Sequence, residues 1–326
     1  MTGGAGFIGT ALISSLIDHN KIVVYDTLQR NALERTGLLK HRNITLIKGD
    51  ILEEHKLAKA AKGSSLFIHL AAIAGIDTVI KSPTMTMEVN LVGTRNALRA
   101  ARKSGTVKRF IDFSTSEVYG SYAYKLDELN ATQMGAVGEA RWMYAISKLA
   151  GEHFAHSFNV EFGLPVTSIR PFNIYGPGQV GEGAIHVFVT RALRNEDIEI
   201  HGEGDQIRSW CYIDDIVSAV IMCLEKKKAV GEVFNIGNPR GTTTILSLAE
   251  KVVELCGSKS KITFKPKPYV DVELRIPDIE KAKKILGYRP RIDLDEGLKK
   301  TIVWYRSKIA QETGGKTGTR MSRVSS

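Results

Sequence analysis

A glycine-rich turn that leads straight into an apolar run stands at the beginning of the sequence and constrains the fold more than any other feature. Gly3, Gly6 and Gly9 lie in this turn, and Ala11–Ile13 form the run. Glycine allows a backbone to bend and to approach a pyrophosphate closely, and a glycine in the first helical turn allows tight packing on a sheet. The free N–H groups at the start of the helix would face the phosphates. The segment therefore predicts a turn and a helix that bind a dinucleotide.

A carboxylate after the next strand-like stretch indicates the kind of dinucleotide. Asp26 follows Ile22–Tyr25 and lies near the usual offset of about 20 residues for an acid that binds a ribose hydroxyl. The carboxylate would repel a 2′-phosphate, although Arg30 nearby would suit one. The sequence therefore favours NAD over NADP as the cofactor.

The buried strand that normally precedes such a turn is missing, because only Met1 stands before Thr2. We expect the central strand of the sheet to be absent or reduced to a stub. Apolar neighbours and unpaired backbone groups would then be exposed. We therefore expect the natural start to lie upstream, with Met1 a mis-called or engineered beginning.

Strand-like apolar runs alternate with helical stretches over the first half of the chain. The runs are Ile22–Tyr25, Ile44–Ile47, Leu66–His69, Arg109–Phe113 and Val166–Arg170, and the helical stretches are Ile8–Leu16, Ile51–Ala61, Thr84–Ala101 and Tyr144–Glu161. This alternation is typical of an α/β fold, a doubly wound parallel sheet with helices on both faces. Ligands bind such sheets beyond the carboxyl ends of the strands.

The pattern becomes irregular after about residue 175, which predicts a second, smaller unit. We expect residues 1–174 to form the NAD-binding domain, to which some later segments return. Residues 175–310 would then form mainly a C-terminal substrate-binding lobe. Residues 311–326 are rich in Gly, Ser, Thr and Arg without an apolar period, and we expect them to be disordered.

The composition argues against several other classes of protein. The chain carries a formal net charge of +10, but its basic residues are spread along apparent helix surfaces, which argues against nucleic acid as a partner. No run of about 18 apolar residues and no basic-then-apolar leader occurs, so we expect a cytoplasmic protein without a membrane span. Cys211, Cys223 and Cys256 lack metal-type spacing, so we expect free, buried thiols and no metal site.

A tyrosine and a lysine four residues apart suggest acid–base chemistry. Tyr144 and Lys148 would be neighbours on one face of a helix. A free phenol has a pKa of about 10, too high for a base at neutral pH. An ammonium group nearby, together with a positive nicotinamide ring, would lower that pKa. Thr115 ends a strand on the ligand side and can hydrogen-bond the same substrate hydroxyl as Tyr144.

Taken together, these motifs resemble those of the extended short-chain dehydrogenase/reductases, in the group of nucleotide-sugar epimerases, dehydratases and decarboxylases. The resemblance runs from Thr2 to about Lys308 and rests on TGGAGFIG, Asp26, GDI, HLAA, NLVGT, STSEVYG, YAISK, RPFNIYGPG, Asp214-Asp215 and FNIGNP in this order. It implies a Rossmann-type fold and NAD as the cofactor. The missing first strand is the one departure from the pattern.

The resemblance also implies roles for individual residues. Tyr144 would be the base, Lys148 its electrostatic partner and ribose anchor, and Thr115 a ligand of the sugar hydroxyl. Contacts to NAD would come from Gly3, Gly6, Phe7, Ile8, Gly9, Asp26, Asp50, Ile51, Leu70, Ala71, Ala72, Asn90, Tyr144, Lys148 and Pro171. The nucleotide-sugar substrate would contact Ser116, Asn173, Arg208 and Arg275, the two arginines binding its diphosphate.

Members of this group share a first step, in which a 4-hydroxyl is oxidised to give a 4-keto sugar. The group's 4,6-dehydratases carry Asp where this chain has Ser116, and serine is too weak an acid to help expel a 6-hydroxyl. A UDP-glucuronate decarboxylase is favoured, with Glu117 and Arg208 as the acid–base and orienting groups. A UDP-sugar 4-epimerase stays as the alternative, and a non-catalytic NAD-binding sensor is less favoured because Tyr144 and Lys148 are intact. Relatives commonly form homodimers through the helices Thr84–Ala101 and Tyr144–Glu161.

Overall fold

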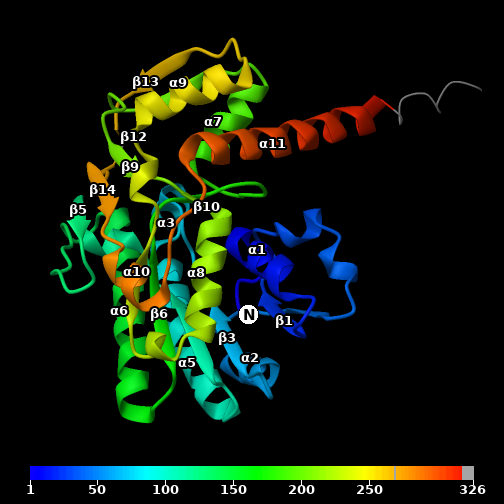
Figure 1. The fold of residues 1–326 in the computed structure, drawn as a ribbon, viewed down its shortest axis with the longest axis vertical. Coiled ribbons are helices and arrows are strands. Elements are labelled where there is room, and N and C mark those ends of the chain that lie inside the picture. Colours follow the sequence, from blue (N-terminus) through cyan, green and yellow to red (C-terminus); the bar gives the residue numbers. More distant parts are fainter. Residues whose placement is uncertain (268, 318–326) are drawn as a thin grey trace, which may run out of the picture.

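The computed structural model describes residues 1–267 and 269–317. A parallel sheet forms its base, with the strands in the order β2, β1, β3, β4, β6 and β11, and Thr2 between β1 and β3 (Figure 1). The strands are β1 (Ile22–Asp26), β2 (Ile44–Lys48), β3 (Leu66–His69), β4 (Arg109–Phe113), β6 (Val166–Pro171) and β11 (Val233–Ile236). The Rossmann-type α/β architecture predicted from the sequence is confirmed.

The central strand is reduced to Met1–Gly3, as the sequence predicted, but its backbone is paired on both sides. Thr2 forms a parallel bridge with Tyr25 of β1 and another with His69 of β3. The Thr2 N–H donates to the Ile68 carbonyl at 3.0 Å, and the Leu70 N–H donates to the Thr2 carbonyl at 2.9 Å. The expectation of unpaired backbone groups was therefore wrong, because one residue is enough to join the neighbouring strands.

Alternate side chains of the strands enter two separate cores. Phe67 and Phe110 stack with ring centroids 4.9 Å apart in the core under α2, α5 and α6, whereas Ile68 and Ile111 enter the core that includes α8. The first face is covered by α2 (Glu54–Ala61), α5 (Gly93–Ser104) and α6 (Ala140–Phe162), and the second by α1 (Phe7–Leu16), α8 (Ile213–Glu225) and α10 (Glu280–Leu286). Helices on both faces explain why these strands are nearly continuously apolar.

The helix predicted over Thr84–Ala101 is interrupted in its middle. It consists of α4 (Pro83–Met87), a π-helical segment (Glu88–Val92) and α5, preceded by the short helix α3 (Ile76–Lys81). The helix predicted over Ile51–Ala61 begins only at Glu54. Single-turn π segments are frequent at functional sites, and this one contains Asn90.

A second group of strands and helices lies at the other end of the molecule (Figure 1). Its main sheet has the order β12, β9, β14 and β5, so that β5 of the first half pairs with β14 of the second. The elements are β5 (Tyr122–Leu126), β7 (Ile174–Tyr175), α7 (Ala184–Leu193), β8 (Ile198–His201), β9 (Ile207–Ser209), β10 (Cys211–Tyr212), β12 (Thr242–Thr244), α9 (Ile245–Cys256), β13 (Ile262–Lys265) and β14 (Leu274–Pro277).

Helix α11 (Leu294–Thr317) projects away from the body of the molecule (Figure 1). Irregular structure was expected from Gln311, but the helix continues through Thr317, and residues 318–326 lie outside the described part of the chain. None of the helices described is long and apolar enough to cross a membrane. Cys211 and Cys223 are buried free thiols, as predicted, whereas the free thiol of Cys256 is only partly buried.

Candidate active site

A cavity of about 330 Å³ lies at the carboxyl ends of the first strands, beside the glycine turn. Eight of the residues predicted to bind NAD line it together: Gly3, Gly6, Asp26, Asp50, Ile51, Leu70, Ala71 and Ala72. Further lining residues that sequence reasoning missed include Tyr25, Ile73 and Thr78. Both polar side chains, such as Asp26 and Thr78, and apolar ones, such as Ile51 and Leu70, line the cavity, a combination that suits a dinucleotide.

Two glycines of the turn are required by close contacts. Gly3 has a φ of +68°, and a Cβ there would lie 2.5 Å from the backbone nitrogen of Ala71. A Cβ on Gly9 would lie 2.6 Å from the Cα of Gly4, so the start of α1 can approach the turn only without a side chain. These contacts fit the roles that the sequence predicts for the turn.

The carboxylate of Asp26 binds backbone N–H groups of the glycine turn and of the segment after β1. Its two oxygens accept hydrogen bonds from the N–H groups of Ala5 at 3.0 Å and Leu28 at 2.8 Å. Arg30, which would have suited a 2′-phosphate, donates instead to Thr78 and pairs with Glu182 at 3.4 Å. This arrangement fits NAD better than NADP, because the nearby guanidinium already has an anionic partner.

Several predicted cofactor residues do not line this cavity. Phe7 lines a different groove on the outer side of α1. Asn90 is completely buried, and its side chain binds the N–H of Ile73 at 2.8 Å and the carbonyl of Ile73 at 3.0 Å. The same amide donates to the Ser147 hydroxyl at 3.0 Å. Asn90 therefore fixes a cavity wall to helix α6 rather than facing the cavity itself.

Tyr144 and Thr115 are brought together as predicted. Burial, and next the charge of Glu117, raise the pKa of Tyr144 to about 12, against the lowering effect of a hydrogen bond with Thr115. The ammonium of Lys148 is buried with Asp112 and Glu152 as its charged neighbours, and burial lowers its pKa. The lowering of the Tyr144 pKa by Lys148 that the sequence suggested is therefore not seen in the protein alone. NAD, when bound, supplies both the hydride acceptor and a positive nicotinamide ring that stabilises a phenolate.

Five charged side chains form an alternating row beside Tyr144, which we call the charge row: Arg275, Glu117, Arg141, Asp271 and Arg208. The carboxylate of Glu117 lies 2.7 Å from Arg275 and 2.9 Å from Arg141, and that of Asp271 lies 2.7 Å from Arg141 and 3.2 Å from Arg208. Three guanidinium groups thus face two carboxylates.

The charge row changes what Glu117 can do. Burial alone would raise the pKa of Glu117, but the guanidinium of Arg275 and then that of Arg141 outweigh burial and lower the pKa to about 2. A carboxyl group with this pKa is a carboxylate at neutral pH and has no proton to give. The structure therefore favours an orienting role for Glu117 over the acid–base role expected from the sequence.

The predicted substrate residues hold protein groups in this structure. Arg208 binds Asp271 and the carbonyl of Val272 at 2.5 Å, and Asn173 donates to the carbonyl of Ser209 at 2.9 Å. Ser116 is buried, and Pro171, which was predicted to contact NAD, ends strand β6. Sequence reasoning left Arg141 and Asp271 out of the site. Arg141 stands three residues before Tyr144, a helical spacing that would have placed it nearby, whereas nothing local marks Asp271.

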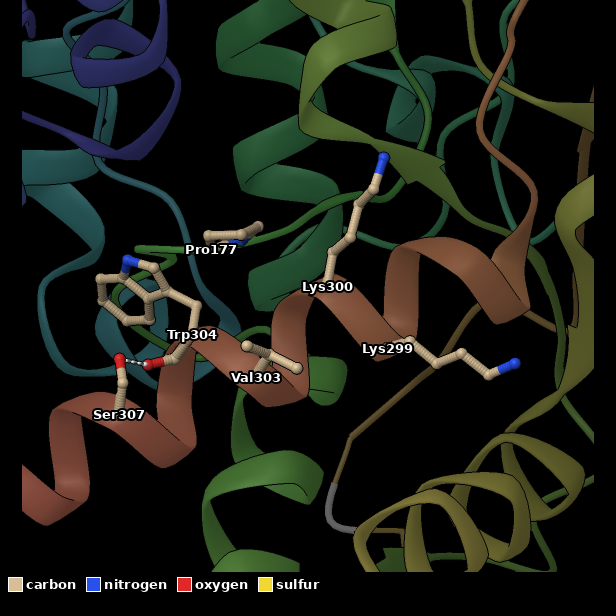
Figure 2. Close-up of a pocket in the computed structure, with 6 residues that line it drawn as sticks. All are labelled: Pro177, Lys299, Lys300, Val303, Trp304 and Ser307. Atoms are coloured by element: carbon tan, nitrogen blue, oxygen red, sulfur yellow. Dashed lines mark hydrogen bonds between the residues drawn. The ribbon is translucent and has the colours of Figure 1, made fainter.

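A second hollow beside α11 has no part in this chemistry. Figure 2 shows Pro177, Val303 and Trp304 along it, with Lys299 and Lys300 pointing away from the indole ring. Its lining holds no carboxylate, tyrosine or histidine. The described residues also contain no group of His, Cys, Asp and Glu that could hold a metal ion.

Relatives with known activities resemble this chain over nearly its whole length. A UDP-N-acetyl-alpha-D-glucosaminuronate decarboxylase from Bacillus cytotoxicus is 34% identical over 94% of this chain and 97% of the relative. UDP-glucuronic acid decarboxylase 1 from Arabidopsis thaliana is 34% identical over 97% of this chain and 71% of the relative.

Solved structures of similar proteins have the same fold as this chain. A UDP-glucose 4-epimerase from Thermotoga maritima superposes with a TM-score of 0.87 at 32% identity, covering 94% of this chain and 98% of that one. A UDP-glucuronic acid 4-epimerase from Bacillus cereus superposes with a TM-score of 0.85 at 29% identity, covering 94% and 98%. The model of the NAD dependent epimerase/dehydratase family matches residues 1–237. The chain therefore belongs to this family of NAD-dependent enzymes that act on nucleotide sugars.

Proposed function

We propose that this enzyme decarboxylates a UDP-linked uronic acid through a 4-keto sugar. One observation carries the proposal: Arg275 is buried beside Glu117, and its Nε atom has no hydrogen-bond partner among the described residues. A buried donor without a partner is costly, and a carboxylate is the group that a guanidinium binds best. The guanidinium of Arg275 also acts on the pKa of Tyr144, which supports a role for Arg275 near the reacting end of the substrate.

The excess of positive charge supports the same conclusion. The charge row holds one more cation than anion. Of two UDP-sugars with the same diphosphate, a uronate brings one further negative charge to this row, whereas a neutral hexose brings none. The decarboxylase names of two similar relatives agree with this reading.

The chain's own residues supply the remaining chemistry. Tyr144, as a phenolate, takes the proton of the 4-hydroxyl, and Thr115 holds that oxygen in place. The hydrogen at C4 would leave as hydride, which bound NAD would accept and later give back, so that C4 becomes a ketone. The 6-carboxylate then belongs to a β-keto acid, which loses carbon dioxide as the C5–C6 bond breaks, and the enolate left behind takes a proton from water at C5. Arg275 orients the carboxylate, instead of the diphosphate that the resemblance implies for it, and Tyr144 returns its proton to the oxygen at C4.

The test is a comparison of substrates with the purified protein and NAD. We expect UDP-glucuronate or UDP-N-acetylglucosaminuronate, labelled with ¹³C at C6, to release labelled carbon dioxide, with the pentose nucleotide found by chromatography. UDP-glucose and UDP-galactose serve as neutral controls. Retention of the label in every uronate would contradict the proposal.

A 4-epimerase is the second candidate, because two solved relatives carry that activity and Tyr144, Lys148 and Thr115 suffice for it. In the same assay it would produce a 4-epimer that keeps the C6 label. A 4,6-dehydratase is disfavoured by Ser116, and absence of all turnover would indicate a sensor.

We also propose a homodimer through the face formed by α3, α4 and α6. Apolar side chains are exposed there on all three helices: Ile80, Met85, Ile146 and Val160. Exposed apolar patches of this kind mark protein interfaces. Sedimentation equilibrium is expected to give twice the chain mass, and an Ile80→Glu, Ile146→Glu variant is expected to sediment as a monomer. A wild-type protein that is monomeric at micromolar concentration would contradict the dimer.

A further inference from the structure

Arg141 occupies the middle of the charge row and is the only one of its arginines to contact both carboxylates. Its Nη1 atom donates to both oxygens of Glu117 at 2.9 Å, and its Nη2 atom donates to Asp271 at 2.7 Å. Its Nε atom donates to the carbonyl of Val270 at 3.2 Å. Every nitrogen of this guanidinium is thus used within the protein.

The place of Arg141 in the fold connects two distant parts of the chain. It is the second residue of α6, one helical turn before Tyr144, so its backbone moves with the catalytic helix. Val270 and Asp271 belong to the segment that leads into β14, the strand of Arg275. Arg141 therefore joins the helix of the base to the strand of the arginine that faces the sugar.

We propose that Arg141 is a positioning residue that acts through Glu117: it fixes the direction of the Glu117 carboxylate, which in turn holds Arg275 toward the reacting end of the substrate. The proposal rests on the proposed function only for the role of Arg275. We assign Arg141 no contact with a reacting atom, because each of its three nitrogens already binds Glu117, Val270 or Asp271.

The contacts of Glu117 show why one arginine would not be enough. The closest contact of Arg275 is with the Oε1 atom, at 2.7 Å, whereas Arg141 donates to both oxygens. Without the two bonds from Arg141, the carboxylate would be freer to rotate about its last torsion. Two hydrogen bonds between a guanidinium and a carboxylate fix the orientation of the carboxylate better than one bond does. Loss of Arg141 should therefore displace Arg275 without removing it.

The pKa of Glu117 reports on its contact with Arg141 in the protein without substrate, and turnover then shows whether this contact matters for the reaction. The groups that act on it are Arg141 and Tyr144 from α6, Arg275 from β14, Arg208 from β9 and the Thr115 hydroxyl, which accepts from the Glu117 N–H at 3.2 Å. Removing the positive charge of Arg141 should raise the pKa of the Glu117 carboxyl by roughly 1 pH unit or more. Removing Asp271 should not raise it.

The experiment compares Arg141→Gln, Arg141→Lys and Asp271→Asn, with the exposed Arg306→Gln on α11 as a matched control. Protein labelled with ¹³C at glutamate carboxyls is titrated by NMR, and the Glu117 signal is assigned as the one lost in Glu117→Gln. In the wild type this signal should stay that of a carboxylate down to pH 4, and in Arg141→Gln it should begin to shift at higher pH. Arg141→Lys keeps the positive charge but loses the planar set of guanidinium donors. The Glu117 carboxyl should therefore stay ionised in this variant.

Turnover gives the second measurement. Arg141→Gln should lower kcat by about 100-fold with KM changed by less than about 3-fold, since misorientation within the site affects the chemical step. Arg141→Lys should lower kcat by about 10-fold through lost geometry alone. If Arg141→Gln does not bind NAD or does not unfold cooperatively, the kcat of Arg141→Lys tests the proposal in its place.

A Glu117 titration and a kcat in Arg141→Gln equal to those of Arg306→Gln would overturn the proposal. So would an Arg141→Lys variant with wild-type kcat. The NMR titration needs no substrate, so a failure of the wild type to decarboxylate any uronate would count against the proposed function while leaving this test intact.

Discussion

The Nε2 atom of His69 lies 3.0 Å from the hydroxyl of Thr94, and this contact determines which ring nitrogen carries the proton. Thr94 donates its own proton to the carbonyl of Asn90 at 2.6 Å, so it accepts from His69. The Nδ1 atom must then accept from the Thr2 hydroxyl, 2.7 Å away. His69 is a neutral Nε2–H tautomer that joins the glycine turn to the helix of Asn90.

Replacing Thr94 by valine should leave that N–H buried without an acceptor. An unsatisfied buried donor costs about 1–3 kcal/mol, so the free energy of unfolding of Thr94→Val should fall by this amount in urea titrations. Thr94→Ser keeps the hydroxyl and is the matched control. A valine variant as stable as the serine variant would show that the contact contributes nothing.

His69 should also make stability depend on pH. Burial, followed by the charge of Lys148, lowers its pKa from 6.5 to about 3. Between these two pH values the unfolded chain binds a proton at His69 that the folded chain does not, so the free energy of unfolding falls as pH falls through this window.

A difference measurement isolates this effect. Asp112 acts in the opposite sense, because burial raises its pKa from 3.8 to about 6 and the folded state holds its proton in that interval. The difference in unfolding free energy between wild type and His69→Gln should therefore shrink from pH 7 to pH 4. A difference that is constant with pH would contradict the assignment.

Tyr144→Phe should abolish turnover and spare NAD binding. The ring stays in place while the oxygen that takes the 4-hydroxyl proton is lost, and such a group contributes about 10²–10⁴-fold to the rate. NAD affinity, followed by quenching of intrinsic fluorescence, should change little. The variant Tyr305→Phe, on α11, controls for loss of a phenol elsewhere. Turnover within a few-fold of wild type would remove Tyr144 from its role as the base.

Gly9→Ala should weaken NAD binding and lower the melting temperature. The added Cβ would meet the Cα of Gly4 at 2.6 Å, and neither backbone segment can give way without moving the turn. Gly151→Ala in α6 is the matched control, since its Cβ would lie at 3.4 Å from the Thr94 side chain, an ordinary contact. Equal NAD affinity in both variants would contradict the packing role of Gly9.

The sequence predicted the strands well because each is a short apolar run with clear limits. Leu66–His69 and Arg109–Phe113 were expected at the bounds that the structure has. The π-helical segment at Glu88–Val92 was not foreseen, because one extra residue per turn barely changes the apolar period. The continuation of α11 beyond Gln311 was missed because it leaves no core-facing pattern.

The site was predictable only where its residues are close in the sequence. The glycine turn and the pair Tyr144 and Lys148 are local patterns, and the structure brings their neighbours together. The charge row is assembled from positions between 117 and 275, so its pairings depend on the tertiary fold. The low pKa of Glu117 was not foreseen for this reason, since it depends on Arg275 and Arg141, which lie far from Glu117 in the sequence.

In the main sheet, β1 and β2 pair with β3, β4, β6 and β11 only through the short bridge at Thr2. On one side lies Asp26 and on the other lie Leu70 and Ala71, and the backbone hydrogen bonds between the two sides run through Met1, Thr2 and Gly3. A dinucleotide in the cavity would contact residues on both sides of this bridge and so stabilise their association. Amide hydrogens of β1 and β2 should accordingly exchange faster than those of β4 and β6, and slow down when NAD is added.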